Sequence, residues 1–357
     1  MKYYKQIVKN LLIVAVLFLL TFNCKNKSSS LIQENVTVFG KFPNEEKVLF
    51  QEVYEFKEGV AAILHSVDST LIIHNNTKNG YFFYNYSLSD HKLSKGYLKR
   101  GRGPQEAIGA RVSGISNDML WLYDITLKKI LTLTNLKASI EDFSPSFNEY
   151  PVKDSYYMIA FCDSLNYLSV GSRNSNYKVQ ELNSKTNNVT NEFGIFKNIP
   201  SNMPFDAYKD AHQSFIFVKP SGDKAVLAYR FTDMVEIFNL KDYSNKIVKG
   251  VENFNIEFDP LKVGKDFYLM GRNKETRMAF IGGCVTNEHI YMAYSGVLTE
   301  RPESYYSKYI YVYDWFGNPV KKMNLDRNIL SITVTKDDKT LYAFDVDSGY
   351  IVKANIN

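Results

Sequence analysis

Short apolar strands that alternate with polar turns run along most of the chain. Residues 309–320 are the clearest example, because aromatic and β-branched residues lead into Asp-Trp-Phe-Gly-Asn-Pro before an apolar residue follows. Aromatic and β-branched side chains pack well on a pleated surface, and glycine and asparagine tolerate the backbone of a tight turn. The pattern therefore predicts strands joined by turns, and no long helical periodicity follows the first two dozen residues.

This unit recurs six times after residue 60. In each unit an apolar strand leads through a turn rich in Asp, Asn or Ser to a second apolar strand and then to a third. Six apolar residues, spaced by 49, 48, 58, 64 and 51 positions, anchor the second strands: Leu71, Leu120, Leu168, Val226, Ile290 and Leu341. Periods of about 40–50 residues with several strands each are typical of propeller blades. The sequence predicts an all-β, six-bladed β-propeller over residues 36–357, and a pair of β-sandwiches is the alternative.

The spacing also predicts where the ring is interrupted and how it closes. The two long intervals require insertions, which we place near 195–210 and 254–275, where strand signals are few. Candidate strands at 36–39 and 47–53 precede the first unit, and the sixth unit offers only three strands. We expect the strand at 47–53 to complete the last blade, because pairing the first strand with the last removes two exposed sheet edges.

Residues 1–23 are typical of a secretory signal peptide. Three lysines precede an apolar run over 11–22, and that run is shorter than the roughly 20 residues that a membrane span needs. Cys24 follows at once and begins a short polar tether through residue 35. The arrangement resembles bacterial lipoprotein signals, in which this cysteine carries lipid and becomes the mature N-terminus. The resemblance implies lipidation of Cys24 and stable membrane attachment through more than one acyl chain.

The resemblance also bears on the compartment. No acidic cluster follows Cys24, which favours a protein on the outer membrane that faces the periplasm over one exported to the cell surface. The alternatives are a soluble periplasmic protein with a free Cys24 and a protein that keeps its leader as an uncleaved anchor.

Charge and cysteine content narrow the classes of partner. The formal net charge is +5, the leader lysines contribute three of these charges, and acidic and basic residues are otherwise interspersed. This balance gives no electrostatic argument for nucleic acid. Cys162 and Cys284 lie in apolar segments, so we expect two small buried residues, with a disulfide as the alternative. Their spacing fits no zinc motif.

Two stretches resemble the TolB-like six-bladed β-propeller lipoproteins of Gram-negative bacteria. Residues 101–106 read Gly-Arg-Gly-Pro-Gln-Glu, similar to a G-x-G-P-x-E loop between the first blades of that group, with Gln105 where glycine is more usual. Residues 277–280 and 287–296 are similar to its penultimate blade. The resemblance covers roughly residues 40–355 and implies the propeller fold. It implies little about activity, because most of the group has no assigned function.

The loop at 98–106 is the first candidate for ligand binding. Its glycines allow a sharp turn that exposes backbone N–H groups, and Arg100 and Arg102 add positive charge beside Gln105 and Glu106. Such a loop suits an anion or a carboxylated sugar. The alternative is a structural turn in which Glu106 pairs with an arginine.

A second basic group and one histidine complete the candidates. Arg272 and Arg277 flank an acidic residue at the second insertion. They would join Arg102 in one basic funnel if both groups face the same end of the channel. The alternative is a solvated charged loop. His212 is the one histidine that we would test as an acid–base group. We expect His65 and His74 in turns or at the surface. Exposed aromatic residues such as Trp315 and Tyr305 would stack on sugars or cover blade edges.

We identify no catalytic residue, metal site or cofactor in the sequence. No G-x-S-x-G elbow, phosphate-binding loop or metal-ligand spacing is present. We expect a membrane-anchored module that binds or scaffolds a protein or glycan in the cell envelope. The alternative is a propeller enzyme, a glycan hydrolase, lyase or lactonase, at one end of the channel. Two carboxylates about 5–10 Å apart in the channel would favour hydrolysis, and a basic or neutral channel would favour binding.

Overall fold

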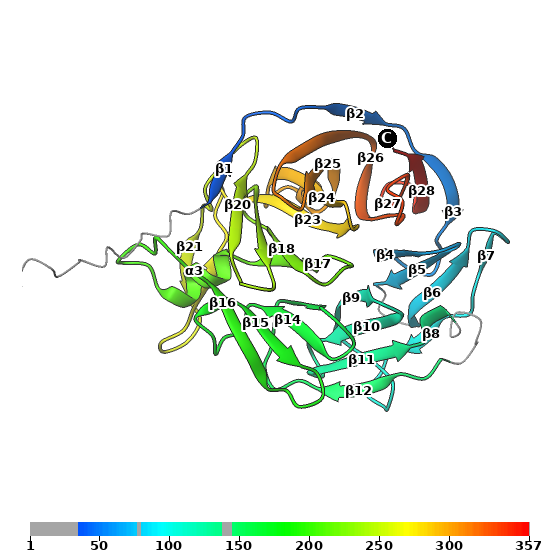
Figure 1. Cartoon of the computed structure of the whole chain (residues 1–357), viewed down its shortest axis with the longest axis horizontal. Helices are drawn as coiled ribbons and strands as arrows, with labels where there is room; N and C mark the ends of the chain where they lie inside the picture. Colours follow the sequence, from blue (N-terminus) through cyan, green and yellow to red (C-terminus); the bar gives the residue numbers. More distant parts are fainter. Residues whose placement is uncertain (1–34, 77–79, 138–144, 357) are drawn as a thin grey trace, which may run out of the picture. The chain divides into compact units, whose positions relative to one another are not determined.

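Antiparallel hydrogen bonding organises the described residues into six blades arranged in a ring (Figure 1). The computed structural model describes residues 35–76, 80–137 and 145–356, and residues 36–357 form one compact unit. The all-β, six-bladed propeller is confirmed, and the alternative of two β-sandwiches is wrong. The leader at 1–23 and the lipidation site Cys24 lie outside the described residues.

The first three blades follow the chain in order, with the first strand of each lying innermost (Figure 1). Blade 1 consists of β4 (Ala61–Val67), β5 (Thr70–Asn75), β6 (Tyr81–Ser87) and two short strands that both pair with β6, β7 (Lys92–Leu93) and β8 (Tyr97–Lys99). Blade 2 consists of β9 (Ala110–Ser116), β10 (Met119–Asp124), β11 (Lys129–Thr134) and β12 (Asn148–Pro151). Blade 3 consists of β13 (Met158–Phe161), β14 (Asn166–Val170), β15 (Tyr177–Asn183) and β16 (Val189–Ile195).

Blades 5 and 6 share one strand, and the N-terminal segment pairs with all three of the last blades. Blade 4 consists of β17 (Ser214–Val218), β18 (Lys224–Tyr229), β19 (Met234–Asn239) and β20 (Asn245–Lys249). Blade 5 consists of β23 (Arg277–Val285), β24 (His289–Leu298), β25 (Ser307–Asp314) and the first half of β26 (Pro319–Val334). Blade 6 consists of the second half of β26, then β27 (Thr340–Asp345), β28 (Tyr350–Asn355) and β3 (Gln51–Glu55).

The six residues predicted to anchor the second strands are all fully buried. Each has a relative exposure of 0%: Leu71, Leu120, Leu168, Val226, Ile290 and Leu341. Burying one such aliphatic side chain stabilises a fold by about 1.5–3 kcal/mol. The repeat is therefore a repeat of core positions, one for each blade.

The N-terminal segment closes the ring and also runs along its rim. β3 pairs antiparallel with β28, which confirms that the start of the propeller completes the last blade. The predicted strand at 47–53 is divided, because β2 (Glu45–Val48) pairs parallel with β26 before the chain turns at Leu49 and Phe50 into β3. β1 (Val36–Val38) pairs parallel with β20, so this segment spans three blades (Figure 1).

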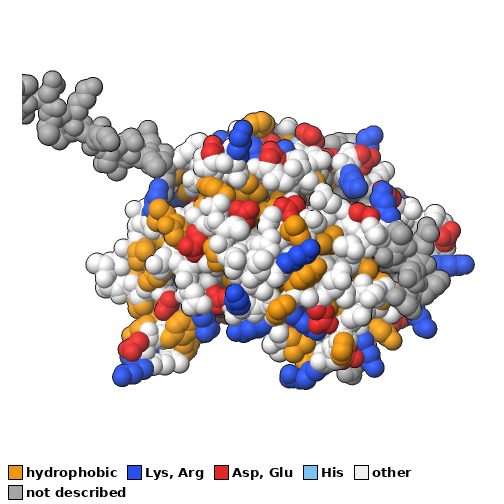
Figure 2. Space-filling view, turned by 60° about the horizontal axis from the view of Figure 1, so that its bottom comes forward, with side chains coloured by type: hydrophobic (Ala, Val, Ile, Leu, Met, Phe, Trp, Pro, Cys, Tyr) orange, Lys and Arg blue, Asp and Glu red, His pale blue; other side chains and the backbone are white. Residues whose placement is uncertain are grey.

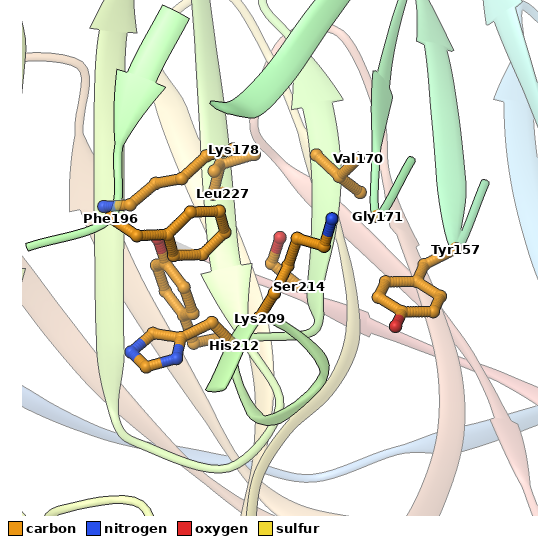
Figure 3. Close-up of a pocket in the computed structure, with 10 residues that line it drawn as sticks. Tyr157, Val170, Gly171, Lys178, Phe196, Lys209, His212, Ser214 and Leu227 are labelled. Atoms are coloured by element: carbon orange, nitrogen blue, oxygen red, sulfur yellow. The ribbon is translucent and has the colours of Figure 1, made fainter. Parts of the chain in front are cut away.

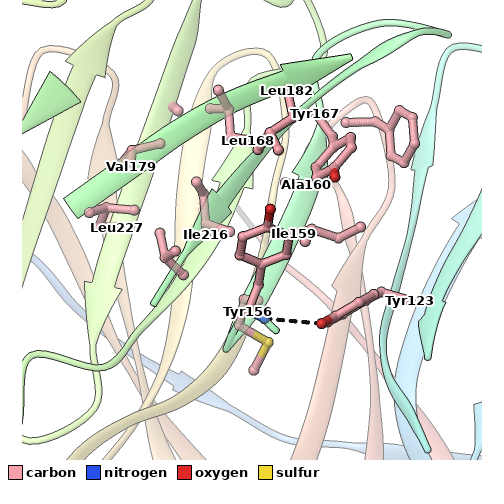
Figure 4. Close-up of a cluster of buried hydrophobic side chains, with 14 of the residues drawn as sticks. Tyr123, Tyr156, Ile159, Ala160, Tyr167, Leu168, Val179, Leu182, Ile216 and Leu227 are labelled. Carbon is pink, nitrogen blue, oxygen red and sulfur yellow. Dashed lines mark hydrogen bonds between the residues drawn. The ribbon is translucent and has the colours of Figure 1, made fainter. Parts of the chain in front are cut away.

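Aromatic side chains fill the space between neighbouring blades. In the cluster of Figure 4, the backbone N–H of Tyr156 donates a hydrogen bond to the Tyr123 hydroxyl at 3.0 Å, which joins the approach to blade 3 to blade 2. The rings of Tyr156 and Tyr167 meet edge to face with centroids 6.4 Å apart. Tyrosine suits such positions because its ring fills the core while its hydroxyl can reach a partner, as that of Tyr123 does.

Both predicted insertions are present. The first contains helix α3 (Phe205–Ala211), and the second contains a hairpin of β21 (Asp259–Lys262) and β22 (Tyr268–Gly271) that packs against α3. The short helix η1 (Pro302–Tyr305) joins β24 to β25. No helix within the described ranges is long and apolar enough to cross a membrane.

These connections all emerge at one end of the strands. In an up-and-down blade, the connection that leads into the first strand and the connection between the second and third strands lie at the same end. We call this end the insertion face and define it by three connections between blades, at 100–109, 196–213 and 250–276, and two connections within blades, at 230–233 and 299–306.

The structure shows the surroundings of two aromatic residues and two cysteines that the sequence singled out. Trp315 is 3% exposed and donates from Nε1 to the carbonyl of Thr286 at 3.0 Å, so it covers a blade edge, whereas Tyr305 is exposed. Cys162 and Cys284 are unpaired and partly buried, so the alternative of a disulfide between them is wrong.

The expectation for His65 and His74 is wrong. His65 lies in β4 and His74 in β5, and both imidazoles contact the Ser113 hydroxyl of blade 2, at 3.0 and 2.8 Å. Polar side-chain atoms that are shielded from water need a hydrogen-bond partner, and these two imidazoles find theirs on the neighbouring blade.

Candidate functional site

The loop at 98–106 supplies its own anion. The Glu106 carboxylate folds back over the turn and accepts a hydrogen bond from the backbone N–H of Gly103 at 2.7 Å. A side chain at Gly101 would collide with this carboxylate, which explains why glycine stands there. An external anion would have to compete with Glu106 for the same N–H groups.

Gln105 occupies a backbone position that suits glycine. Its φ is +53°, in the left-handed region that a Cβ disfavours. The residue is held by its contacts: its backbone N–H donates to Glu149, and its side-chain oxygen accepts from the backbone N–H of Phe147 at 2.9 Å. These contacts fix the loop to blade 2.

The two arginines of this loop are placed differently. Arg100 lies over the Phe82 ring, with its guanidinium carbon 5.7 Å from the ring centroid. The side chain of Arg102 is exposed and has no hydrogen-bond or ion-pair partner among the described residues.

Arg277 and Arg272 of the second insertion face different surroundings. The Arg277 guanidinium pairs with Glu252, donates to the carbonyl of Gly296 at 2.7 Å and stacks 4.3 Å from the Phe254 ring. These contacts use most of its donors. Arg272 instead donates to the Tyr305 hydroxyl at 3.0 Å and stacks on Phe231 at 5.5 Å, and no carboxylate of the described residues pairs with it.

Arg230 lies near both Arg272 and Arg111, and neither Arg230 nor Arg111 was a candidate from the sequence. Arg230 follows β18 and lies between the rings of Phe215 and Phe231, at 5.6 and 5.9 Å. Burial, together with the nearby charges of Arg111 and Arg272, lowers the pKa of Arg230 to about 10. Arginines 111, 230 and 272 are far apart in the sequence, so no local motif could have joined them.

A β-bulge aims Arg111 toward this group. In the pairing of β9 with β10, Tyr123 faces Val112 and Asp124 faces Ala110, so Arg111 is the extra residue. Bulges re-aim a side chain in this way. The Arg111 Nε donates to the carbonyl of Tyr157 at 3.3 Å, which draws its side chain toward blade 3.

Asp210 joins the two insertions to the ring. Its carboxylate accepts hydrogen bonds from the Tyr157 hydroxyl at 2.5 Å, from Gln213 at 2.8 Å and from the backbone N–H of Met270 at 2.8 Å. The residue is buried. One carboxylate thus connects blade 3, α3 and β22.

Its neighbour Lys209 acts on the connection at 171–176. The buried Lys209 ammonium donates to the carbonyls of Ser172 and Ser175, at 3.0 and 2.9 Å. Burial lowers the pKa of Lys209. The Lys209 ammonium therefore holds this connection in place, and most of its hydrogen-bond donors are already used.

His212 lies at a small hollow between blades 3 and 4 (Figure 3). Its Nδ1 is 2.7 Å from the carbonyl of Tyr208, and a carbonyl only accepts, so Nδ1 carries the hydrogen. Burial lowers the pKa of His212 to about 4, so the ring is neutral at pH 7. The hollow also holds Lys178, which pairs with the buried Glu236 at 2.8 Å. It has room for little more than a water molecule.

The candidates therefore fall into three groups. Arg272 joins Arg111 and Arg230, Arg277 is bound to Glu252, and the loop with Arg102 lies on the same insertion face between blades 1 and 2. In residues 35–76, 80–137 and 145–356 there is no cluster of three or more His, Cys, Asp or Glu side chains suited to a metal. The surface view mixes acidic, basic and apolar side chains (Figure 2).

A family profile and a solved structure from Bacteroides fragilis agree with the propeller architecture. A family profile described as "TolB-like 6-blade propeller-like" matches residues 38–337. A crystal structure of an exported protein from Bacteroides fragilis is similar with a TM-score of 0.53 at 12% identity, over 90% of this chain and 99% of that chain. The β-propeller domain of Cps50 (Swd1) from Myceliophteria thermophila gives a TM-score of 0.46 at 10% identity, over 87% and 100%. No curated protein matches the sequence.

Proposed function

The chain belongs to the TolB-like 6-blade propeller-like family, and we propose that it is a lipid-anchored binding module of the bacterial cell envelope. Residues 1–23 direct export, Cys24 carries the lipid, and the propeller presents its insertion face to a protein or glycan partner. The signal-like leader supports export, as does the description of the Bacteroides fragilis relative as an exported protein.

One observation favours binding over hydrolysis. On the insertion face the charges of Arg111 and Arg272 both act on Arg230, and none of the three arginines has a carboxylate partner among the described residues. A hydrolase of the two-carboxylate type would need acidic groups where these cations lie. A cationic surface on a rigid ring suits recognition instead, because loops on a rigid scaffold are the usual place for binding.

A blocking experiment tests which face binds. We would label full-length protein with a maleimide polymer at Lys274→Cys on the insertion face, or at Ser164→Cys in the turn between β13 and β14 at the opposite end. Both native positions are exposed. Cys162 and Cys284 should react poorly, because burial raises the pKa of both thiols.

Binding would be measured as a thermal shift against peptidoglycan fragments, glycans and acidic small molecules, and by retention of proteins from envelope extracts. A small ligand at 100 times its Kd adds about 2.7 kcal/mol of stability. We expect the label at position 274 to abolish binding and the label at 164 to leave it intact. Loss of binding only with the label at 164, or no binding to any probe or extract, would contradict the proposal.

A further inference from the structure

Arg230 is a partly buried cation whose backbone the fold holds in place. Its backbone is fixed on both sides, because its N–H donates to the carbonyl of Gln213 at 2.9 Å and its carbonyl accepts from Ala279 at 2.6 Å. Its Nε is buried and has no hydrogen-bond partner. The side chain is therefore positioned, yet part of its donor capacity is unused.

The neighbours of Arg230 add positive charge. Arg111 and Arg272 both oppose its charge, and no carboxylate of the described residues pairs with it. Like charges that lie close together repel one another, and an opposite charge placed among them relieves the repulsion. Three arginines, from β9, from the end of β18 and from the end of β22, therefore concentrate positive charge that an anion would balance.

Aromatic rings hold these guanidinium groups without using their N–H donors. Phe231 lies next to both Arg230 and Arg272, with their guanidinium carbons 5.9 and 5.5 Å from its centroid. A ring contact of this kind uses the face of the guanidinium plane and leaves the edge free for hydrogen bonds. The Tyr305 hydroxyl, which already accepts from Arg272, can donate its own hydrogen to a further acceptor.

From these contacts we propose that Arg111, Arg230 and Arg272 form a site for an oxyanion that carries two or more negative charges, such as a phosphate monoester or a polycarboxylate. The Tyr305 hydroxyl is the fourth donor. Arginine binds both kinds of group through paired N–H donors. The inference rests on the proposed binding function and names the chemical group that the insertion face recognises.

The site is separate from the loop at 98–106. There the Glu106 carboxylate already accepts the backbone N–H of Gly103, whereas no carboxylate of the described residues pairs with Arg230. Within the described part of the chain, the arginine group is thus the better candidate for an external anion.

Isothermal titration of the full-length protein in detergent tests the inference. The probes are inorganic phosphate, citrate and acetate at constant ionic strength. We expect phosphate or citrate to bind and acetate to bind at least tenfold more weakly, because a single charge cannot satisfy three guanidinium groups. Binding of phosphate alone identifies a phosphate ligand, and binding of citrate alone identifies a polycarboxylate. Binding of neither, or equal binding of acetate, overturns the inference.

Variants separate the site from a general effect of charge. Arg272→Met removes an exposed guanidinium from the group and should weaken binding by about tenfold or more, since a hydrogen bond to a charged group contributes about 1.5–3 kcal/mol. Arg301→Met removes the same charge from an exposed side chain with no described partner on the same face and should change binding less than twofold. Equal losses in both variants overturn the inference.

Arg230→Lys provides a second test that retains the charge. It removes the planar donors and should weaken binding about tenfold while the melting temperature changes little. If no oxyanion binds but the label at position 274 still blocks capture of a glycan or protein, the proposed function stands and this inference falls. If that label has no effect on capture and oxyanions still bind, this inference stands and the proposed function falls.

Discussion

Two histidines in the ring, His65 and His74, must stay uncharged for the fold to keep its full stability. Burial lowers the pKa of His65 to about 4, and burial together with the nearby His65 lowers the pKa of His74 to about 3. In the unfolded chain both would titrate near 6.5. Both rings contact the single hydroxyl of Ser113, which can donate to only one of them.

These pKa values predict a loss of stability in acid. Below about pH 6.5 the unfolded chain takes up protons that the folded chain refuses until about pH 4, so the free energy of unfolding should fall as the pH drops through this window. Thermal melts at pH 7.5, 5.5 and 4.5 would measure the effect. His74→Gln should flatten the slope, and His91→Gln, at an exposed position, should not. The same slope in all three proteins would contradict the prediction.

Asp210 is the residue on which the insertions depend. Asp210→Ala should lower the free energy of unfolding by about 3 kcal/mol, because it leaves the Tyr157 hydroxyl and the backbone N–H of Met270 without an acceptor. Asp266→Ala, at an exposed position of the β21–β22 turn, should change stability by less than about 0.5 kcal/mol. Urea unfolding measures both, and a loss below 1 kcal/mol at Asp210 would refute the assignment.

At the scale of elements, the N-terminal segment does more than close the ring. β3 completes blade 6, and β2 and β1 then extend the sheets of blades 5 and 4 by parallel pairing. Covering these edges removes unpaired backbone groups that would otherwise invite association.

Truncation tests this role. Deletion of residues 36–56 should abolish the cooperative melt, because blade 6 loses its fourth strand and the ring opens. Deletion of residues 36–40 alone removes only β1 and should lower the melting temperature without abolishing cooperativity. Circular dichroism against temperature distinguishes the two, and a cooperative melt at the original temperature after the longer deletion would show that closure is dispensable.

At the scale of the whole molecule, we expect the proposed lipid anchor and the proposed binding face to be separable. The compact unit of residues 36–357 has its own core, so loss of the lipid should release the protein without unfolding it. Cys24→Ser should move the protein from the membrane fraction to the soluble fraction, and Cys162→Ser should leave it in the membrane fraction. Fractionation followed by immunoblotting measures this. A Cys24→Ser protein that stays in the membrane fraction would favour an uncleaved leader.

The sequence by itself determined the six blades, the two insertions and the closing strand, because each depends on local pattern. Apolar residues that alternate with turns mark strands, and a fixed spacing of core residues such as Leu71 and Leu120 marks blades. The break at Leu49 and Phe50 was missed, because whether an extended segment pairs with one neighbour or two is decided by what lies beside it.

Only the tertiary structure decided which polar residues meet. Arg272 was a candidate from its local charge, whereas Arg111 and Arg230 joined it through the ring and a β-bulge in β9. The burial of His65 and His74 likewise depends on the neighbouring blade. Periodicity reports which side of a strand is apolar, but contacts between residues more than a hundred positions apart arise only when the blades pack together. The local sequence pattern therefore predicts the core of this protein, whereas its candidate site follows only from how the blades pack.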